Sequence, residues 1–269
     1  MPELPEVETI ARKLKPLLLG RTIQDARLRW PRTLAFPTSR KFSERIKGQV
    51  IQDVTRRAKY FILRLSDFSL LIHLRMSGDL LIKEGKIKPE KHDRLILSLL
   101  SANGGLSHLV FNDTRKFGRV WLTANPEDVL GKLGPEPLSW AFTPSWLHTA
   151  LHTRHRLLKP LLLDQTFLAG IGNIYADESL HLAKLHPLAA SDAVTVEQAE
   201  ALHGAICQVL KEGIHRNGAS FDWVYRGGEY HFRVYDRAGK PCPVCGTGIE
   251  RIIVGQRSTY FCPTCQLLS

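Results

Sequence analysis

The sequence has no run of apolar residues long enough to cross a membrane. A membrane-spanning helix needs about 18–20 apolar residues in a row, and every apolar stretch in this 269-residue chain is interrupted sooner. The N-terminal segment MPELPEVET is acidic and lacks the apolar centre of a secretory signal. We therefore expect a cytoplasmic protein with no membrane partner.

Acidic residues are scarce relative to basic ones. The chain has 26 Asp and Glu against 37 Lys and Arg, which gives a formal net charge of +11. A summed positive potential attracts phosphates over long distances, so a nucleic acid is the simplest partner. A generally basic protein is the plainer interpretation. The charge alone favours nucleic acid only slightly and identifies no reaction.

Cysteine is almost absent outside the C-terminus, because four of the five cysteines fall within the last 28 residues. They form two close pairs, Cys242 with Cys245 and Cys262 with Cys265, which enclose sixteen residues. The cytosol keeps thiols reduced, and two such pairs can hold opposite sides of one tetrahedral ion. Two redox pairs are the alternative, but the strand-to-helix context of redox motifs is missing. Four thiolates leave no open position for a substrate, so we predict one structural Zn²⁺.

The hydrophobic pattern changes along the chain. Apolar residues recur at helical spacing over 7–19, and short strand-like segments separated by turn signals follow from 22 to about 123. After Pro126 the pattern is helical, most clearly over 144–152, 174–185 and 196–216. Many short strands within about 100 residues are typical of a sandwich or barrel. The sequence therefore predicts a β-rich unit followed by a helical one.

Two glycines, Gly170 and Gly172, precede the predicted helix that starts near Asn173. Glycines before a helix let backbone N–H groups approach a phosphate closely, and the helix dipole adds partial positive charge there. Asn173 can cap the helix or donate to a phosphate. A tight turn between packed helices is the plainer interpretation of the glycines alone.

The N-terminus carries a second candidate site. Met1 precedes Pro2, and a small second residue commonly allows removal of the initiator methionine. Pro2 would then be a free secondary amine with a pKa of about 7.7–8.0, able to add to an aldehyde-like sugar carbon and form an iminium. Glu3 could transfer protons, and Glu6 lies one helical turn further on. Alternatively, Pro2 stiffens the start of a helix and the two glutamates complement its dipole.

Basic and bulky residues flank several predicted strands. Lys59 lies in RRAKY, His73 and Met76 lie in HLRMSG, and Arg115 and Phe117 lie in DTRKFG. Such residues could contact phosphates or replace an extruded base. A solvated charged face with Met76 and Phe117 in the core is the plainer interpretation of each segment alone.

These segments occur together and in one order along nearly the whole chain. The stretches MPELPEVE, RRAKY, HLRMSG, DTRKFG, LGPEPL, GIGNIYADE and the terminal four-cysteine segment with QRSTYFC closely resemble bacterial formamidopyrimidine-DNA glycosylases. The resemblance implies an α+β multidomain fold with three parts. These would be an N-terminal β-sandwich with an N-terminal helix over 1–125, a helical helix–two-turn–helix domain over 126–236, and a zinc-finger β-hairpin over 237–269.

The resemblance also implies an activity. The protein would be a monomeric, bifunctional glycosylase and lyase of base-excision repair that acts on damaged double-stranded DNA. It would excise oxidised purines, namely formamidopyrimidines and 8-oxoguanine, through a Schiff base on Pro2 and would cleave the strand by β,δ-elimination. The structural zinc would take no part in either step.

Each matching residue acquires an implied role. Catalytic roles fall to Pro2, Glu3, Lys59 and Arg257, with Glu6 in support. DNA contacts fall to His73, Arg115, Asn173 and Lys159, while Met76, Arg115 and Phe117 would fill the gap left by a flipped nucleotide. The implied zinc ligands are Cys242, Cys245, Cys262 and Cys265.

Two alternative functions remain open. An endonuclease VIII-like glycosylase would prefer oxidised pyrimidines, but that branch usually has glycine before the second proline, where this chain has Leu4. A lesion sensor would keep the binding surface without catalysis, and intact Pro2, Glu3 and Lys59 disfavour it.

The segment 217–240 departs from the family pattern. It is fairly short, and its sequence FDWVYRGG is unlike the Ser/Thr-rich loop that covers flipped 8-oxoguanine in the family. We therefore expect activity on ring-opened purines or other lesions to outrank activity on 8-oxoguanine.

Overall fold

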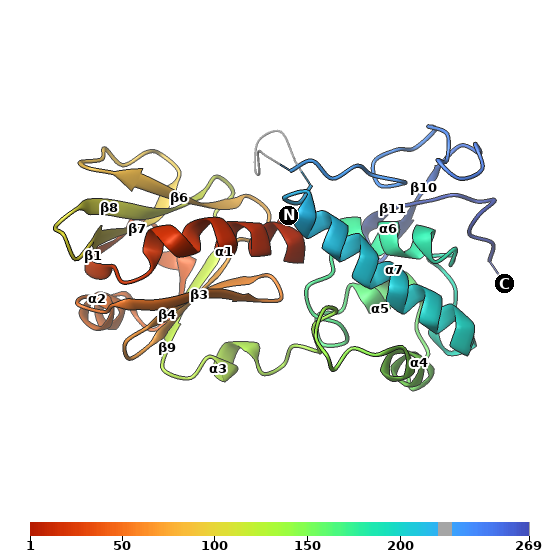
Figure 1. Ribbon diagram of the computed structural model, residues 1–269, viewed down its shortest axis with the longest axis horizontal. Helices are drawn as coiled ribbons and strands as arrows, with labels where there is room; N and C mark the ends of the chain where they lie inside the picture. The colour runs from red at the N-terminus through yellow and green to blue at the C-terminus, as the bar shows by residue number, and fades with distance from the viewer. Residues whose placement is uncertain (220–227, 269) are drawn as a thin grey trace. The chain divides into compact units, whose positions relative to one another are not determined.

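The computed structural model describes residues 1–219 and 228–268. They form two compact units, the first containing Met1–Lys132 and the second containing Leu133–Ala219 with the chain from Glu229 onward. Figure 1 shows both units and labels helices and strands in each. Among the described helices, none combines the length and the apolar character needed to span a membrane.

Helix α1, Leu4–Leu18, opens the first unit. Glu3 is its N-cap, and Glu6 completes a capping box by accepting a 2.7 Å hydrogen bond from the Glu3 N–H. One face of the helix is buried, at Val7, Ile10, Leu14 and Leu18. The helix predicted over 7–19 is thus confirmed, with an earlier start because the capping box fixes the first turn.

The strands of the first unit form two sheets. One has the order β1-β7-β8-β6 and the other β2-β9-β5-β4-β3, and all neighbours are antiparallel except β2 and β9. The first sheet contains β1 (Thr22–Leu28), β6 (Gly78–Glu84), β7 (Asp93–Leu100) and β8 (Leu106–Asp113). The second contains β2 (Leu34–Phe36), β3 (Ile51–Arg57), β4 (Tyr60–Leu65), β5 (Ser69–His73) and β9 (Arg119–Thr123).

A single hydrophobic core joins the two sheets. It contains side chains from both, among them Phe61, Leu97 and Phe111, together with the apolar face of α1. Helix α2 (Ser39–Ile46) packs against β1, and the one-turn helices η1 (Pro31–Thr33) and α3 (Glu127–Leu130) complete the unit. The predicted β-sandwich is confirmed, since alternate residues of each strand face this shared core.

Helices dominate the second unit. They are α4 (Pro144–His152), α5 (Leu158–Leu162), α6 (Asn173–Leu182), η2 (Ser191–Ala193) and α7 (Val196–His215). Helix α7 packs against α4 and α6. Thr195 caps α7 by accepting a 3.3 Å hydrogen bond from the Gln198 N–H. The three helices predicted in this region are confirmed, with small differences at their ends.

A β-hairpin closes the second unit. Strands β10 (Glu250–Val254) and β11 (Arg257–Phe261) are joined by a two-residue turn. Gly255 and Gln256 both have positive φ, 53° and 62°, as the favoured two-residue hairpin turn requires. Strand β11 packs against α6. Strand β11 begins at Arg257, one of the predicted catalytic residues.

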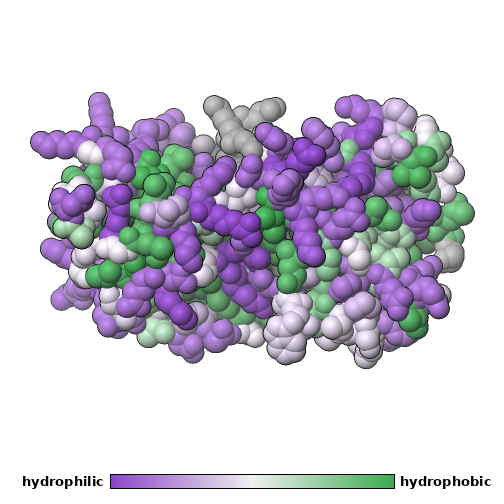
Figure 2. Space-filling view, viewed as in Figure 1, coloured by the Kyte–Doolittle hydropathy of each residue, from purple (hydrophilic) through white to green (hydrophobic). Residues whose placement is uncertain are grey.

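The visible face of the molecule is mostly hydrophilic, with apolar side chains in small separate patches (Figure 2). Exposed large apolar residues of the first unit include Met76 and Phe117, at 37% and 51% exposure. These two side chains therefore do not belong to the core of the first unit.

We predict that replacing glycine by alanine has opposite effects on stability at positions 118 and 204. A Cβ on Gly118 would overlap Phe111 Cζ and lie 2.9 Å from Phe111 Cε1; because Phe111 is buried in the core, we expect Gly118→Ala to destabilise the first unit by about 1–3 kcal/mol. A Cβ on Gly204, in α7, meets nothing within 4 Å, so Gly204→Ala should stabilise by about 0.5–1 kcal/mol. Denaturant unfolding of both variants measures the two shifts. Denaturation midpoints that shift in the same direction for both variants would contradict this packing.

Candidate active site and zinc centre

The start of the chain is packed into the first unit. Pro2 is buried, and Glu3 and Glu6 are only 2% and 1% exposed. Burial lowers the pKa of the terminal amino group, here that of Met1, below its usual 8.0, while the Glu3 and Glu6 carboxylates oppose this lowering. This environment disfavours the protonated form of the Met1 amino group, and an amine acts as a nucleophile only when it is unprotonated.

Two cations also lower the pKa of the terminal amino group. Lys59 and Arg115 do so by like-charge repulsion. Lys59 is 4% exposed and shares the two-residue turn between β3 and β4 with Ala58, whose φ is 51°. Side chains from three separate segments of the chain therefore affect the pKa of the terminal amino group.

His73 ends β5 in the same unit. Its Nδ1 accepts a 3.0 Å hydrogen bond from the Arg75 N–H, and its ring meets the Tyr60 ring edge-on at 4.8 Å. Burial, with the charges of Arg75 and Lys59, lowers the pKa of His73 to about 3. The ring is therefore neutral at pH 7 and carries its hydrogen on Nε2, where it can donate to an acceptor such as a phosphate oxygen.

A buried carboxylate organises the loop after β8. Asp113 is fully buried and accepts hydrogen bonds from the Ser77 hydroxyl, from the Arg115 N–H at 3.2 Å and from the Gly118 N–H at 2.8 Å. These bonds fix the loop backbone on both sides of Phe117. The Arg115 guanidinium lies 5.1 Å from the centroid of the Phe117 ring. The loop therefore presents Arg115 and Phe117 together.

The four clustered cysteines of the second unit fit one tetrahedral zinc ion. Their Sγ atoms lie within 4.8 Å of one another, with Cys242 and Cys265 3.9 Å apart and Cys245 and Cys262 3.4 Å apart. Sulfurs bound to one zinc at 2.3 Å would lie about 3.8 Å apart. The predicted zinc-finger site is confirmed as a four-cysteine cluster able to hold one Zn²⁺.

The start of α6 meets the start of β11. The Asn173 amide donates to the Ser258 carbonyl at 2.9 Å. Asp177, one turn later in α6, accepts a 3.0 Å hydrogen bond from the Tyr260 N–H. Burial raises the pKa of Asp177 to about 7, against the opposing charge of the Lys159 ammonium. Asn173 and Lys159 thus lie against the same hairpin strand, which begins at the exposed Arg257.

Lys159 differs from the other predicted DNA contacts, because its side chain has no exposed surface. Its ammonium lies 2.6 Å from Asp177 Oδ1 and donates to the Ser258 carbonyl and the Thr259 hydroxyl. In this structure the ammonium has no exposed surface for a phosphate to contact. The local sequence Leu158-Lys159-Pro160 does not indicate this burial, because it is equally compatible with an exposed lysine.

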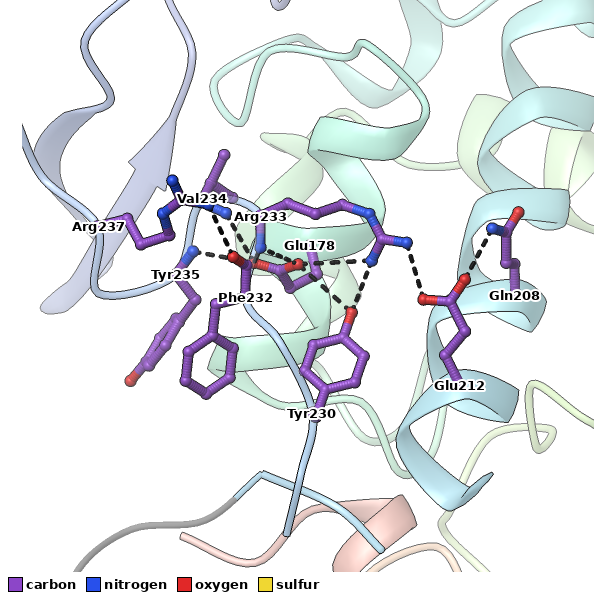
Figure 3. Close-up of polar contacts among 9 residues, drawn as sticks. All are labelled: Glu178, Gln208, Glu212, Tyr230, Phe232, Arg233, Val234, Tyr235 and Arg237. Atoms are coloured by element: carbon purple, nitrogen blue, oxygen red, sulfur yellow. Dashed lines mark hydrogen bonds and ion pairs between the residues drawn. The ribbon is translucent and has the colours of Figure 1, made fainter. Parts of the chain in front are cut away.

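A second buried carboxylate of α6 anchors the chain that leads to the zinc finger (Figure 3). Glu178 accepts hydrogen bonds from the N–H groups of Arg233, Val234 and Tyr235, each at 2.9 Å at its nearest oxygen. The Arg233 side chain continues the network to Glu212 of α7 at 2.8 Å. Burial raises the pKa of Glu178, while these N–H groups lower it.

Sequence reasoning missed the two organising carboxylates, Asp113 and Glu178. Both lie inside the motifs DTRKFG and GIGNIYADE, but the motifs alone predict no role for either carboxylate. A carboxylate directly after a predicted buried strand, or on an apolar helix, was the available signal. The atypical segment FDWVYRGG, expected to influence lesion choice, lies largely at 220–227, outside the described residues.

Three family descriptions match the sequence. The formamidopyrimidine-DNA glycosylase N-terminal domain matches residues 1–120, and the formamidopyrimidine-DNA glycosylase H2TH domain matches residues 133–223. The zinc finger found in FPG and IleRS matches residues 239–267. Together they cover most of the chain in the order expected.

Known proteins resemble the chain over its full length. Formamidopyrimidine-DNA glycosylase of Chloroflexus aurantiacus is 50% identical, over 99% of this chain and 98% of the relative. The enzyme of Pelotomaculum thermopropionicum is 43% identical, over 99% of each. The structure of Lactococcus lactis Fpg with DNA containing an abasic site has a TM-score of 0.91 at 33% identity and covers 99% of this chain and 100% of that one. The wild-type Lactococcus lactis protein with DNA containing an oxidised pyrimidine has a TM-score of 0.90 at 35% identity, with the same coverage.

Replacing Cys262 tests the zinc centre. We expect Cys262→Ser to lose stoichiometric zinc and to loosen the C-terminal hairpin, because three thiolates hold the ion less tightly and metal binding supplies folding energy. Metal analysis and limited proteolysis measure the two effects. Cys207→Ser is the control, since Cys207 lies in α7 and contacts the Pro137 carbonyl. Retained zinc and normal DNA binding in Cys262→Ser would contradict the structural role.

Proposed function

Because this chain belongs to the formamidopyrimidine-DNA glycosylase family of base-excision repair, we propose that it excises oxidised purines from damaged double-stranded DNA and then cleaves the strand. The observation that carries this proposal is the buried chain start, where Pro2, Glu3 and Glu6 are all buried and lie next to one another in the sequence. The proposed enzyme acts as a monomer in the bacterial cytoplasm. Its proposed domains span 1–125, 126–236 and 237–269.

The proposed nucleophile is the secondary amine of Pro2 after removal of Met1. While Met1 is attached, the Pro2 nitrogen is an amide and cannot attack. In the processed chain the nitrogen bonds to C1′ of the damaged nucleotide as the bond between C1′ and the base breaks, and the proton of the amine passes to the departing base. Protonation of the ring oxygen then breaks the bond between C1′ and that oxygen, which opens the sugar and gives a covalent iminium.

Glu3 is the proposed acid and base. It protonates the ring oxygen of the sugar as the ring opens. A proton is then removed from C2′, next to the iminium carbon, and the 3′ phosphate leaves; a second elimination releases the 5′ phosphate. Glu6 supports the site by holding the Glu3 backbone through its 2.7 Å hydrogen bond. Lys59, whose charge lowers the pKa of the Met1 amino group, contacts a phosphate near the lesion.

The first unit also offers side chains for holding a distorted duplex. The Nε2–H of neutral His73 donates to a phosphate. Met76, Arg115 and Phe117 fill the gap left by the flipped nucleotide, which offsets part of the few kcal/mol that unstacking costs. The exposure of Met76 and Phe117 supports this role, because neither is used in the core of the unit.

The second unit supplies further phosphate contacts. Asn173 at the start of α6 and the exposed Arg257 at the start of β11 are the proposed ligands. The N-terminus of α6 favours an anion, and Gly170, with φ 108°, shapes the backbone before it. The zinc, when bound, holds the hairpin that carries Arg257, and the covalent steps belong to Pro2 and Glu3.

Borohydride trapping tests the covalent mechanism. Sodium borohydride reduces an iminium to a stable amine, so the processed enzyme should become linked to a duplex that carries a formamidopyrimidine. Pro2→Gly should reduce the linked fraction by about tenfold or more, because the secondary amine is lost. Duplexes with 8-oxoguanine and with thymine glycol, run in parallel, rank the lesions.

The matched control is a chain that retains Met1, verified by mass spectrometry, which should not be trapped. Absence of trapping by correctly processed protein would favour a lesion sensor over an enzyme. A strong preference for thymine glycol would favour the oxidised-pyrimidine branch.

Replacing Arg257 tests the proposed phosphate contact of the second unit. Arg257→Ala should weaken DNA binding and lower the slope of log affinity against log salt by about 1, because one fewer counterion is released. Fluorescence anisotropy at several salt concentrations measures both. Arg251→Ala, on the opposite strand of the same hairpin, should leave the slope unchanged. An unchanged slope for Arg257→Ala would rule out the contact.

A further inference from the structure

Lys159 and Asp177 form an ion pair that has no exposed surface. Lys159 Nζ lies 2.6 Å from Asp177 Oδ1, and both side chains are 0% exposed. Taking two charges out of water is costly, and their attraction offsets this cost only when further hydrogen bonds complete the arrangement. Such bonds are present, because the ammonium donates to the Ser258 carbonyl at 2.9 Å and to the Thr259 hydroxyl at 2.7 Å.

The hydrogen-bond partners of the pair are consecutive residues of β11. Ser258 and Thr259 accept from Lys159, and the Tyr260 N–H donates to Asp177 Oδ2 at 3.0 Å. All three directly follow Arg257 in the sequence. The ion pair therefore attaches the strand that begins at Arg257 to helices α5 and α6.

This attachment is directional. An apolar contact would keep β11 near the helices but would tolerate rotation of the strand, whereas hydrogen bonds to a carbonyl, a hydroxyl and an N–H fix its orientation. The Asn173 amide adds a further bond to the Ser258 carbonyl at 2.9 Å. A group held in its binding orientation before the partner arrives loses less conformational entropy on binding.

We propose that Lys159 and Asp177 are positioning residues that hold Arg257 ready to contact a DNA phosphate. This inference rests on the proposed function of the chain, and neither residue touches DNA. Lys159 fixes the carbonyl side of the strand and Asp177 fixes its N–H side. The Arg257 guanidinium then meets a phosphate oxygen without rearrangement of the hairpin.

The test combines variants of the pair with Arg257→Ala. Lys159→Met, Asp177→Asn and the double variant are made both with Arg257 present and in the Arg257→Ala background. The double variant removes both charges together, so that neither is left unpaired in the interior. Its asparagine also keeps an oxygen that can accept from the Tyr260 N–H. If a single variant fails to fold, the double variant decides the test.

Zinc-loaded, full-length protein is titrated at several salt concentrations with a duplex that carries a tetrahydrofuran abasic analogue. This analogue cannot form an iminium, so binding is read without chemistry. We expect each variant to weaken binding about tenfold when Arg257 is present, and to cause no further loss in the Arg257→Ala background. Arg156→Ala is the matched control, because it removes an ion pair with Asp164 at 2.7 Å whose arginine is 44% exposed; it should leave binding unchanged.

Two other roles of Lys159 predict different effects of these variants on DNA binding. A direct phosphate contact predicts that Lys159→Met lowers the salt slope by about 1 even without Arg257, while Asp177→Asn leaves it unchanged. A purely structural role predicts a lower Tm with unchanged binding by the folded, zinc-loaded protein. Either pattern would overturn the positioning role.

Amide hydrogen exchange gives a second readout that needs no DNA. Exchange at residues 258–260 should accelerate in each variant, while exchange in α7 stays the same. Unchanged exchange along β11, or variants that bind as tightly as the unaltered protein, would overturn this inference alone. Failure of the unaltered protein to bind the duplex would overturn the proposed function together with it.

Discussion

The C-terminal part of the second unit depends on the buried polar face of α6. Its own apolar cluster is small, comprising Val234, Cys242, Ile249, Tyr260 and Cys262, and a core of that size stabilises little by itself. Asn173, Asp177, Glu178 and His181 recur at spacings that share one side of a helix. They meet, in turn, the Ser258 carbonyl, the Tyr260 N–H, the N–H groups of residues 233–235 and the sulfur of Cys242. Hydrogen bonds from helix α6 thus add to the stability that this small apolar cluster provides, and a zinc ion bound by the four cysteines would add to it further.

In the first unit, too, buried carboxylates hold the backbone of neighbouring segments, at two places. Glu6 accepts from the Glu3 N–H at the start of α1, and Asp113 accepts from the Arg115 and Gly118 N–H groups after β8. In each case a buried carboxylate on a regular element holds the backbone of a neighbouring segment: the buried chain start in the first case, and the loop that carries the exposed Arg115 and Phe117 in the second. Hydrogen bonds to a carboxylate are roughly twice as strong as those between neutral groups. A loop held in this way can present Arg115 and Phe117 in a fixed arrangement without a core of its own.

The sequence was sufficient for the features that local rules determine. The cysteine spacing predicted the metal cluster, and periodicity predicted α1, the strands and the long helix α7, because capping and face patterns act over a few residues. It was insufficient where the partner of a charged group lies far along the chain. Asp177 is 18 positions after Lys159, and Ser258 is 99 positions after it. No local pattern records that pairing, and the DNA contact of Lys159 was predicted only from the resemblance to the family, which does not indicate that the side chain is buried. The carboxylates Asp113 and Glu178 were missed for the same reason.

Burial also changes how the net charge of +11 acts on a polyanion. Lys159 is neutralised within the second unit, and Arg94, at 6% exposure, donates to the Asp113 and Lys91 carbonyls inside the first. Arg56 pairs with Glu8 at 2.8 Å. These three cations contribute to the sum of charges, but their charged groups already contact carbonyls or carboxylates of the protein, and counterion release counts only the contacts that phosphates make. The field that attracts DNA over distance must therefore come mainly from exposed side chains such as Arg257. The buried cations serve instead to fix the backbone from which those side chains project.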